Sequence, residues 1–526
     1  DKEINSVKIE VIKISDFTIH EHHLNVIYSA DKFQFSTKVF YQDVSFSALQ
    51  QKYSQELIEK IASYIALFEG MKLCSLFPKY YDISRIATHL EKPVLEFFVK
   101  IYQGVFGQHW YENNITDYQQ PEFIYAQDLG EANPVSILGD NRTILTGCGG
   151  GKDSIVAMKM LEEANIPFAS MQYSHSIYGK ADLQHNLIAG VVAEVNPVKS
   201  HKISIFDDFV DFPLFQLYFP ENSGIIAPET PVSVFESLFL MLDKGYNYLC
   251  LAHEKSANTG NMFWEEIGRE VNHQWGKGLE AEQLLDQFIR DNLLSNFKYF
   301  SILQPIYDLR IFQNLSKYPE VIPKIHSCNI KKPWCKKCPK CAYVWLGLMA
   351  FCQTDIVDEV FQVNLFDDED LLPIFQAMIG LSTHTPFECI GEIDESRLMM
   401  KKCLEKGLSG KALNMFAEEV LSDTRIDWEK IEYKYNFHQE IIESPLNITE
   451  CFQKDSHLGK HLLDFIVGAN TTYFSPSQLQ VLLDYLSSNS QKLEGGEIMI
   501  PTSVSFYYFQ KKKEEEIKVW KVFLLG

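Results

Sequence analysis

The chain has 526 residues, with 48 Lys and Arg against 70 Asp and Glu, and a formal net charge of −22 at pH 7. This length is greater than that of a chain with a single hydrophobic core, and it predicts three or four domains at about 150 residues each. A surface this acidic argues against nucleic acid as a partner, although a local basic patch for tRNA stays open. No apolar run reaches the ~20 residues of a membrane helix, and the first residues lack the apolar core of a secretory signal.

The cysteines point to a reducing compartment. Eleven cysteines in so long a chain do not form a disulfide scaffold, and four of them lie within residues 328–341. We therefore expect a cytoplasmic protein with a metal site.

Residues 1–133 predict an N-terminal α+β domain. Apolar and polar residues alternate over 7–14, 24–30 and 33–41, which is the pattern of half-buried strands. From residue 54 to about 107 the apolar period becomes helical. No residue in this domain carries obvious chemistry.

Residues 134–354 alternate predicted strands and helices, which indicates a doubly wound parallel sheet and an α/β fold class. The strands are expected at 143–148, 166–173, 198–206 and 247–254, and the helices at 153–165, 181–196 and 232–246. Ligands of such sheets bind at the carboxyl ends of the strands, where the strand order reverses. The Gly-rich turn at 147–151 follows one of these ends.

The remaining residues predict two C-terminal additions. Residues 355–445 are mainly helical and acidic. Residues 446–526 read as a small α+β tail domain with two helices and a β-hairpin around the charged turn KKKEEE.

The Gly-rich turn is the strongest motif of the chain. Three glycines remove every Cβ between a strand and a helix, so that backbone N–H groups and the helix N-terminus can cradle a phosphate. Lys152 adds a point charge, and Asp153 is either a helix cap or a Mg²⁺ ligand. The spacing fits neither the P-loop motif GxxxxGK[ST] nor the dinucleotide-binding motif GxGxxG. The alternative to a phosphate-binding loop is a glycine-rich turn with a structural role only.

The turn resembles the PP-loop of ATP pyrophosphatases, SGGxDS, which cleave ATP between the α- and β-phosphates and adenylate a carbonyl or carboxylate. The resemblance implies ATP contacts from Gly149, Gly150, Gly151, Lys152, Asp153 and Ser154, and adenine contacts from the strand end at Met171 and Tyr173. Gly149 departs from the pattern, because it replaces a Ser that donates a hydroxyl to the pyrophosphate.

Four cysteines form the second motif, at Cys328, Cys335, Cys338 and Cys341. Two Cys-x2-Cys steps can surround a tetrahedral ion, and thiolates suit Zn²⁺. A site with four protein thiolates is structural rather than catalytic. The alternatives are an iron–sulfur cluster or unligated thiols, and the lysines between the cysteines either offset thiolate charge or are solvated.

Several segments resemble one family, the ATP-dependent UDP-N-acetylmuramoyl-L-alanyl-L-glutamate epimerases, which act in peptidoglycan biosynthesis. The segments are QGVFGQHWYENNI, GGGKDS, HEKSANTGN, VNHQWGKGLEAE, SCN with WCKKCPKCAYVWLGL, and TPFECIGEIDESR, in the family's order. They span about residues 100 to 400 and depart from the family at His253, where it has Asn. The tail loosely resembles that of tRNA(Ile)-lysidine synthetases.

The resemblance implies an isomerase that adenylates the glutamate carboxylate, epimerises Cα and hydrolyses the adenylate, with ATP, Mg²⁺ and a UDP-linked muramoyl dipeptide as its partners. Adenylation makes the Cα–H acidic enough for a general base. Lys152 and Asp153 serve the first step. For the second, Cys389 is a thiol base or a structural cysteine, His273 an acid–base group or a satisfied polar residue, and Glu254 a Mg²⁺ or substrate contact or a helix cap.

Two other readings compete. One is a PP-loop ligase or sulfur-transfer enzyme acting on a nucleobase or tRNA, as in 7-cyano-7-deazaguanine synthases and tRNA-lysidine synthetases. Sulfur transfer needs a reactive cysteine outside the cluster, and only Cys148 and Cys389 qualify. The other is a nucleotide-binding protein without activity, which the intact Lys152, Asp153 and Ser154 disfavour.

Overall fold

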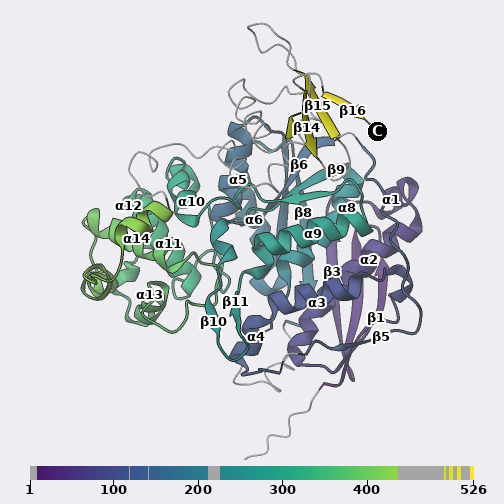
Figure 1. Cartoon of the computed structure of the whole chain (residues 1–526), viewed down its shortest axis with the longest axis horizontal. Helices are drawn as coiled ribbons and strands as arrows, with labels where there is room; N and C mark the ends of the chain where they lie inside the picture. The colour runs from purple at the N-terminus through teal and green to yellow at the C-terminus, as the bar shows by residue number, and fades with distance from the viewer. Residues whose placement is uncertain are drawn as a thin grey trace, which may run out of the picture.

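One ten-stranded sheet runs through the molecule, and the Gly-rich turn follows the third strand from one of its edges (Figure 1). The computed structural model describes residues 9–117, 119–139, 141–210 and 225–435, and the short strands at 491–492, 497–501, 506–510 and 522–525. The strand order is β12-β9-β6-β7-β8-β3-β2-β1-β4-β5, with mostly parallel neighbours. The fold class is therefore mixed α/β, as the alternation of strands and helices predicts.

Five parallel strands form the half of the sheet that carries the Gly-rich turn. They are β6 Asn141–Cys148, β7 Phe168–His175, β8 Lys199–Asp207, β9 Tyr246–Cys250 and β12 Lys298–Phe300. The chain places β7 and β8 on one side of β6, and β9 and β12 on the other. The strand order thus reverses at β6, which puts the turn after β6 at the switch point where open α/β sheets bind ligands.

Five strands from the N-terminal region complete the same sheet. They are β1 Val11–Ile19, β2 His23–Ala30, β3 Phe33–Tyr41, β4 Tyr80–Asp82 and β5 Glu122–Ile124. The join is antiparallel, between β3 and β8, with Thr37 opposite Asp207 and Tyr41 opposite Ile203. The free edge of β8 accepts β3, so the sheet is continuous across residue 133.

Helices cover both faces of the sheet, as adjacent residues of β6 show. Ile144 and Cys148 belong to a core shared with α5 Lys152–Glu163, whereas Leu145 belongs to a second core shared with α8 Glu229–Lys244. Sheet residues alternate between faces, so each face has its own apolar layer. Figure 1 shows α8 beside α2, α3 and α9 across one face.

Helices lie close to the three positions expected at 153–165, 181–196 and 232–246. Those of the site-bearing half are α5, α6 Ala181–Val192, α8 and α9 Leu279–Asn292, and those of the N-terminal region include α1 Phe46–Lys52, α2 Gln55–Glu69, α3 Val94–Val105 and α4 Gly107–Glu112. The C-terminal helices are α10 Asp308–Leu315, α11 Pro339–Phe351, α12 Thr354–Phe361, α13 Leu372–Met378, α14 Ile393–Glu405, α15 Lys411–Phe416 and α16 Trp428–Lys434. Short strands β10 Met262–Trp264 and β11 Arg269–Val271 form a separate hairpin.

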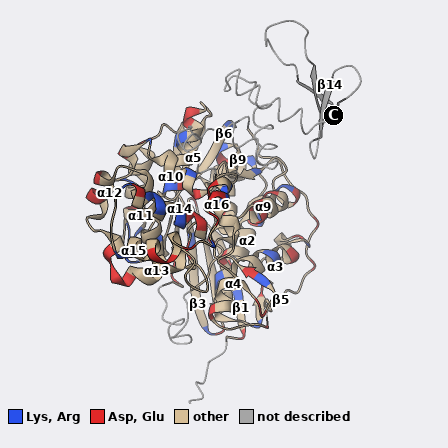
Figure 2. Cartoon of the chain, turned by 60° about the vertical axis from the view of Figure 1, so that its left-hand side comes forward, with Lys and Arg blue, Asp and Glu red and all other residues tan. Residues whose placement is uncertain are grey.

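The region from residue 354 to residue 435 is mainly helical. Figure 2 shows acidic side-chain positions around α12 and α13, at the outer edge of these helices. The two helices expected in the tail lie outside the described residues. Its described part is a four-stranded antiparallel sheet of β13 Gln491–Lys492, β14 Glu497–Pro501, β15 Phe506–Gln510 and β16 Val522–Leu525. No helix within the described ranges has the length and apolar content to cross a bilayer.

Candidate active site

The Gly-rich turn joins β6 to α5 and is braced from one side. Gly150 has φ +85°, and an added Cβ would lie 2.0 Å from Cε1 of His326, so this position requires glycine. The carbonyl of Gly150 accepts a hydrogen bond from the amide of His326 at 3.0 Å. At Gly149 an added Cβ would meet no atom within 4 Å. The turn is therefore open where the PP-loop pattern has Ser.

A cavity of about 280 Å³ lies against this turn, at the carboxyl ends of β6, β7 and β9. It is lined by the motif residues Gly149, Gly151, Asp153 and Ser154, by Met171 and Tyr173 of β7, and by His253, Lys277 and Cys389 among others. Segments far apart in the sequence thus converge on one space. Gly151 caps α5 without a side-chain hydrogen bond, which leaves backbone N–H donors for an anion.

Lys152 lies beneath the turn, in a buried ion cluster. Its side chain is 1% exposed, and Nζ contacts Asp153 at 2.5 Å and also Asp308. Burial alone would lower the pKa of Lys152, but the two carboxylates raise it well above its ordinary value. Burial would raise the pKa of Asp153, yet Lys152 and Lys340 hold it below its usual range. Both groups are therefore charged at neutral pH.

Two further carboxyl groups lie beside this cluster. Burial and the charges of Asp153 and Asp308 raise the pKa of Glu254, which lies in the segment after β9, to about 7. Burial and Asp308 raise the pKa of Glu395 to about 8. Glu395 accepts hydrogen bonds from the amides of Leu309 at 3.1 Å and Glu392 at 2.8 Å, so it fixes helix ends. Glu254 does not line the cavity wall and faces the ion cluster instead.

Cys389 is a cavity thiol with a lowered pKa. Its Sγ lies 2.9 Å from Nζ of Lys277, a contact between residues 112 positions apart. Burial would raise the pKa of Cys389, but Lys277, His273 and Lys340 lower it to about 6. Cys148, in contrast, is a buried core thiol with a raised pKa. At neutral pH Cys389 is therefore a thiolate, the form that abstracts protons or attacks electrophiles.

His273 forms a unit with this thiol. Its Nε2 lies 3.9 Å from Oε1 of Glu388, and its Nδ1 lies 2.6 Å from Oε1 of Gln108 in α4. Burial would lower the pKa of His273, but Cys389 and Glu388 raise it above its ordinary value. One ligand atom from each of His273, Glu388 and Cys389 lies within 4.8 Å of the others. His273 therefore lies beside Cys389 but, unlike Cys389, does not line the cavity.

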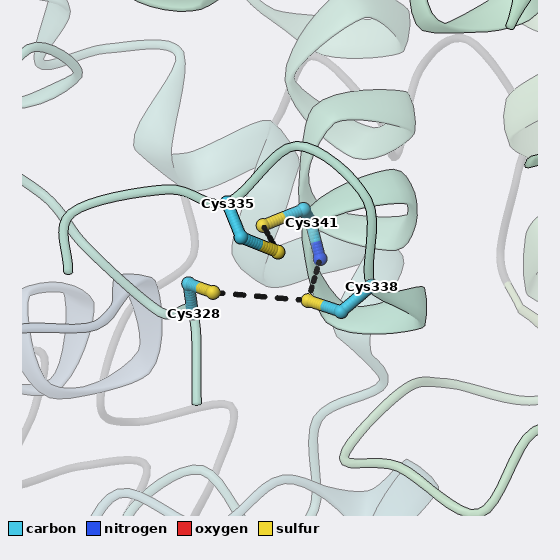
Figure 3. Close-up of side chains that lie close together, drawn as sticks. All are labelled: Cys328, Cys335, Cys338 and Cys341. Atoms are coloured by element: carbon cyan, nitrogen blue, oxygen red, sulfur yellow. Dashed lines mark hydrogen bonds between the residues drawn. The ribbon is translucent and has the colours of Figure 1, made fainter. Parts of the chain in front are cut away.

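The four cysteines of the second motif come together as their spacing predicts (Figure 3). Sγ of Cys328 lies 3.8 Å from Sγ of Cys338, and Sγ of Cys335 lies 3.7 Å from Sγ of Cys341. A tetrahedral zinc site with Zn–S bonds of about 2.3 Å places its sulfurs about 3.8 Å apart. The cluster thus fits structural zinc, and Cys338 also caps the start of α11.

Sequence reasoning missed several polar residues of the site. Asp308 begins α10 and pairs with Lys152, but no motif surrounds it. Lys340 is only 8% exposed, so it is not a solvated lysine. It lines the cavity and donates a hydrogen bond to the Cys389 carbonyl, so its role is not limited to offsetting the charge of the four cysteine thiolates. Lys332 also lines the cavity. The sequence shows a group of lysines near the four cysteines, but only the fold shows that Lys332 and Lys340 line the cavity.

Two family models match this chain. The family described as MurL N-terminal domain matches residues 4–195 and 210–302, and the family described as MurL C-terminal domain matches residues 324–424. The second match contains the four cysteines and Cys389. Together the matches include every segment that lines the cavity.

Three relatives carry the name UDP-N-acetyl-alpha-D-muramoyl-L-alanyl-L-glutamate epimerase. The proteins of Micromonospora sp. and Salinispora tropica are each 30% identical over 50% of this chain, and the matches cover 57% and 56% of their own lengths. The protein of Xanthomonas oryzae pv. oryzae is 28% identical over 57% of this chain and 65% of its own length. The chain thus spans somewhat over half the length of the relatives it matches.

Proposed function

The chain belongs to the MurL family, and on that premise we propose that it uses ATP to invert the α-carbon of the terminal L-glutamate in UDP-N-acetylmuramoyl-L-alanyl-L-glutamate, a peptidoglycan precursor. One observation carries the proposal: the Gly-rich turn and the thiol of Cys389 line the same cavity. An adenylating epimerase needs both a phosphate cradle and a base for the Cα proton.

The first half-reaction belongs to the Gly-rich turn, which we assign as a PP-loop. The α-carboxylate of the glutamate attacks the α-phosphorus of ATP, an acyl-adenylate forms, and pyrophosphate leaves. Backbone N–H groups of residues 149–151 and the start of α5 bind the phosphates, with Ser154 as a further donor. Lys152 stabilises the charge that develops there, and Asp308 holds its ammonium in place.

Mg²⁺ fits the carboxylates next to the turn. Burial, together with repulsion from Asp153 and Asp308, raises the pKa of Glu254 to about 7, and a divalent cation would relieve the repulsion. Asp153 and Glu254 would hold the ion, which supplies charge neutralisation for the phosphates. This assignment makes Glu254 a metal ligand rather than the base at Cα, since it does not line the cavity wall.

The second half-reaction belongs to Cys389. Its thiolate removes the proton from Cα of the adenylated glutamate, and the electron pair moves toward the activated carbonyl, which adenylation has made a strong acceptor. His273 and Lys277 stabilise the thiolate. A proton then arrives on the opposite face of the carbon, and water releases AMP. Because His273 lies beside Cys389 and does not line the cavity, that second proton comes from another wall of the cavity or from water.

The test is an incubation with ATP, Mg²⁺ and the UDP-linked dipeptide in D₂O. We expect AMP, pyrophosphate and deuterium at Cα of a D-glutamate product. Asp153→Ala should abolish AMP formation, because the charge beside Lys152 and the phosphates is lost.

Cys389→Ala separates the two half-reactions. This variant should still exchange labelled pyrophosphate into ATP in the presence of the dipeptide, while deuterium incorporation falls below detection. Exchange and deuterium lost together would place Cys389 in adenylation instead. Wild-type protein that forms neither AMP nor deuterated product would overturn the proposed function.

A further inference from the structure

The loop around the four cysteines forms one wall of the cavity. We call residues 326–340 the cysteine loop. Five of its residues line the cavity: His326, Ser327, Asn329, Lys332 and Lys340. The amide of His326 holds the loop against the carbonyl of Gly150 at 3.0 Å. A metal at the cysteines would therefore fix the shape of a wall that faces the Gly-rich turn.

Two lysines of this loop present charge to the cavity without a carboxylate partner. Within the described ranges, no carboxylate oxygen lies within 4 Å of Nζ of Lys332 or Lys340. Lys332 packs over the Tyr178 ring, 5.3 Å from its centroid, and Lys340 donates to the Cys389 carbonyl. Their loop neighbour Lys337 is instead paired outward with Asp368 at 2.7 Å.

The charges of Glu229 and Cys328 favour the ammonium of Lys332, and Lys340 acts on Asp153 and Cys389, but neither ammonium group has a direct ion-pair partner within the described ranges. Placing a cation in a partly buried position is costly unless an anion or several hydrogen bonds compensate it. Carboxylates are abundant in this chain, yet the nearby Glu229 is occupied by the Tyr178 hydroxyl, which donates to it at 2.6 Å. The cavity wall thus carries two ammonium groups that can still contact an anionic ligand directly.

A hydroxyl completes the wall. The position of a Cβ added at Gly151 lies 3.2 Å from Oγ of Ser327, so this hydroxyl adjoins the Gly-rich turn. Gly149 lacks the hydroxyl of the PP-loop pattern, and the space beside it is open. Ser327 therefore supplies a hydroxyl to the same region from a different segment of the chain.

We propose that the cysteine loop is the second wall of a polyphosphate subsite, in which Lys332 and Lys340 contact phosphate oxygens and Ser327 replaces the hydroxyl that Gly149 lacks. Lysine is a common phosphate ligand as a point charge, and the opposing N–H groups of the Gly-rich turn complete the cradle. The subsite rests on the proposed function only for the origin of the phosphates, which are those of ATP or the diphosphate of the UDP-linked substrate.

Calorimetric titration of the full chain with pyrophosphate, ATP and UDP tests the subsite. Lys332→Met keeps the side-chain length and removes the charge, and we expect it to weaken binding of at least one of these ligands about tenfold, the loss of one charge-assisted contact. Ser327→Ala should weaken the same ligand less. Lys331→Met is the matched control, because Lys331 is an exposed neighbour that does not line the cavity. Zinc content and melting temperature verify that each variant is folded.

The three ligands distinguish the two sources. If Lys332→Met binds pyrophosphate and ATP more weakly but UDP as tightly as wild type does, the subsite belongs to ATP. If Lys332→Met binds only UDP more weakly, the subsite belongs to the substrate diphosphate. If wild type, Lys332→Met and Lys331→Met bind each of the three ligands with the same affinity, the proposed subsite is overturned. Binding does not depend on turnover, so a protein that binds through Lys332 but yields no deuterated glutamate would retain the subsite and lose the epimerase assignment.

Discussion

Sγ of Cys389 lies 2.9 Å from Nζ of Lys277, and this pair sets the charge of the thiol in the cavity. The two residues come from separate segments: Lys277 closes the short helical turn before α9, and Cys389 precedes α14. An ammonium at this distance favours the thiolate strongly in a site that is shielded from water. The pair lowers the pKa of a half-buried cysteine, which suits the role of base proposed for it.

Activity should therefore rise with pH through the pKa of Cys389. This pKa is lowered to about 6, so the thiol is protonated and inactive below pH 6 and ionised above it. Lys277→Met removes the largest lowering charge, and the inflection should move upward by about one pH unit or more. The rate at which iodoacetamide alkylates Cys389, measured as a function of pH, reports the same ionisation of the thiol in the absence of substrate. An unchanged inflection in this variant would show that the ammonium does not control the thiol.

Gln108 should act as a positioning residue for His273. Its Nε2 donates to Glu112 at 3.1 Å, which turns Oε1 toward Nδ1 of His273 at 2.6 Å. Nδ1 then carries a proton, and Nε2 faces Cys389 and Glu388. Gln108→Leu removes this orientation, and we expect kcat to fall about 10- to 100-fold with little change in KM.

The pH profile distinguishes orientation from a general structural loss. In Gln108→Leu the inflection of Cys389 should move upward, because a misplaced imidazole stabilises the thiolate less. Gln108→Glu retains an acceptor for Nδ1 and should restore most of kcat. A fall in kcat with an unmoved inflection, and no recovery in Gln108→Glu, would mean that Gln108 supports the fold only.

The sequence predicts the local motifs of this site but not its long-range partners. A strand, three glycines and a helix define the turn within ten residues, so local rules suffice to find it. The pairing of Lys152 with Asp308 joins residues 156 positions apart, and nothing beside Asp308 marks it. The same holds for the outer strands: alternation predicts β1 to β3, but only the edge of β8 determines where they pair.

Zinc removal should destabilise the protein and the cavity wall together. Wild type should contain one zinc per chain, and Cys338→Ser should lose it, since three thiolates and a hydroxyl bind zinc far more weakly. We expect the melting temperature to fall by about 5 °C or more, which corresponds to a few kcal/mol. Cys403→Ser, at a buried cysteine outside the cluster, is the control and should retain its zinc. A metal-free protein of unchanged stability would contradict a structural zinc site.

Two neighbouring glycines should respond in opposite ways to a side chain. Gly149→Ser places its Cβ where no atom lies within 4 Å, so the melting temperature should change by no more than about 1 °C and AMP formation should persist. Gly150→Ala combines φ +85° with a Cβ only 2.0 Å from the His326 ring. The left-handed backbone alone costs about 1–2 kcal/mol, and the clash displaces the cysteine loop. AMP formation should then fall sharply and the melting temperature by several degrees. If Gly149→Ser and Gly150→Ala had the same effect on melting temperature and AMP formation, His326 would not brace the turn. The cysteine loop would then have to be held in place by other contacts.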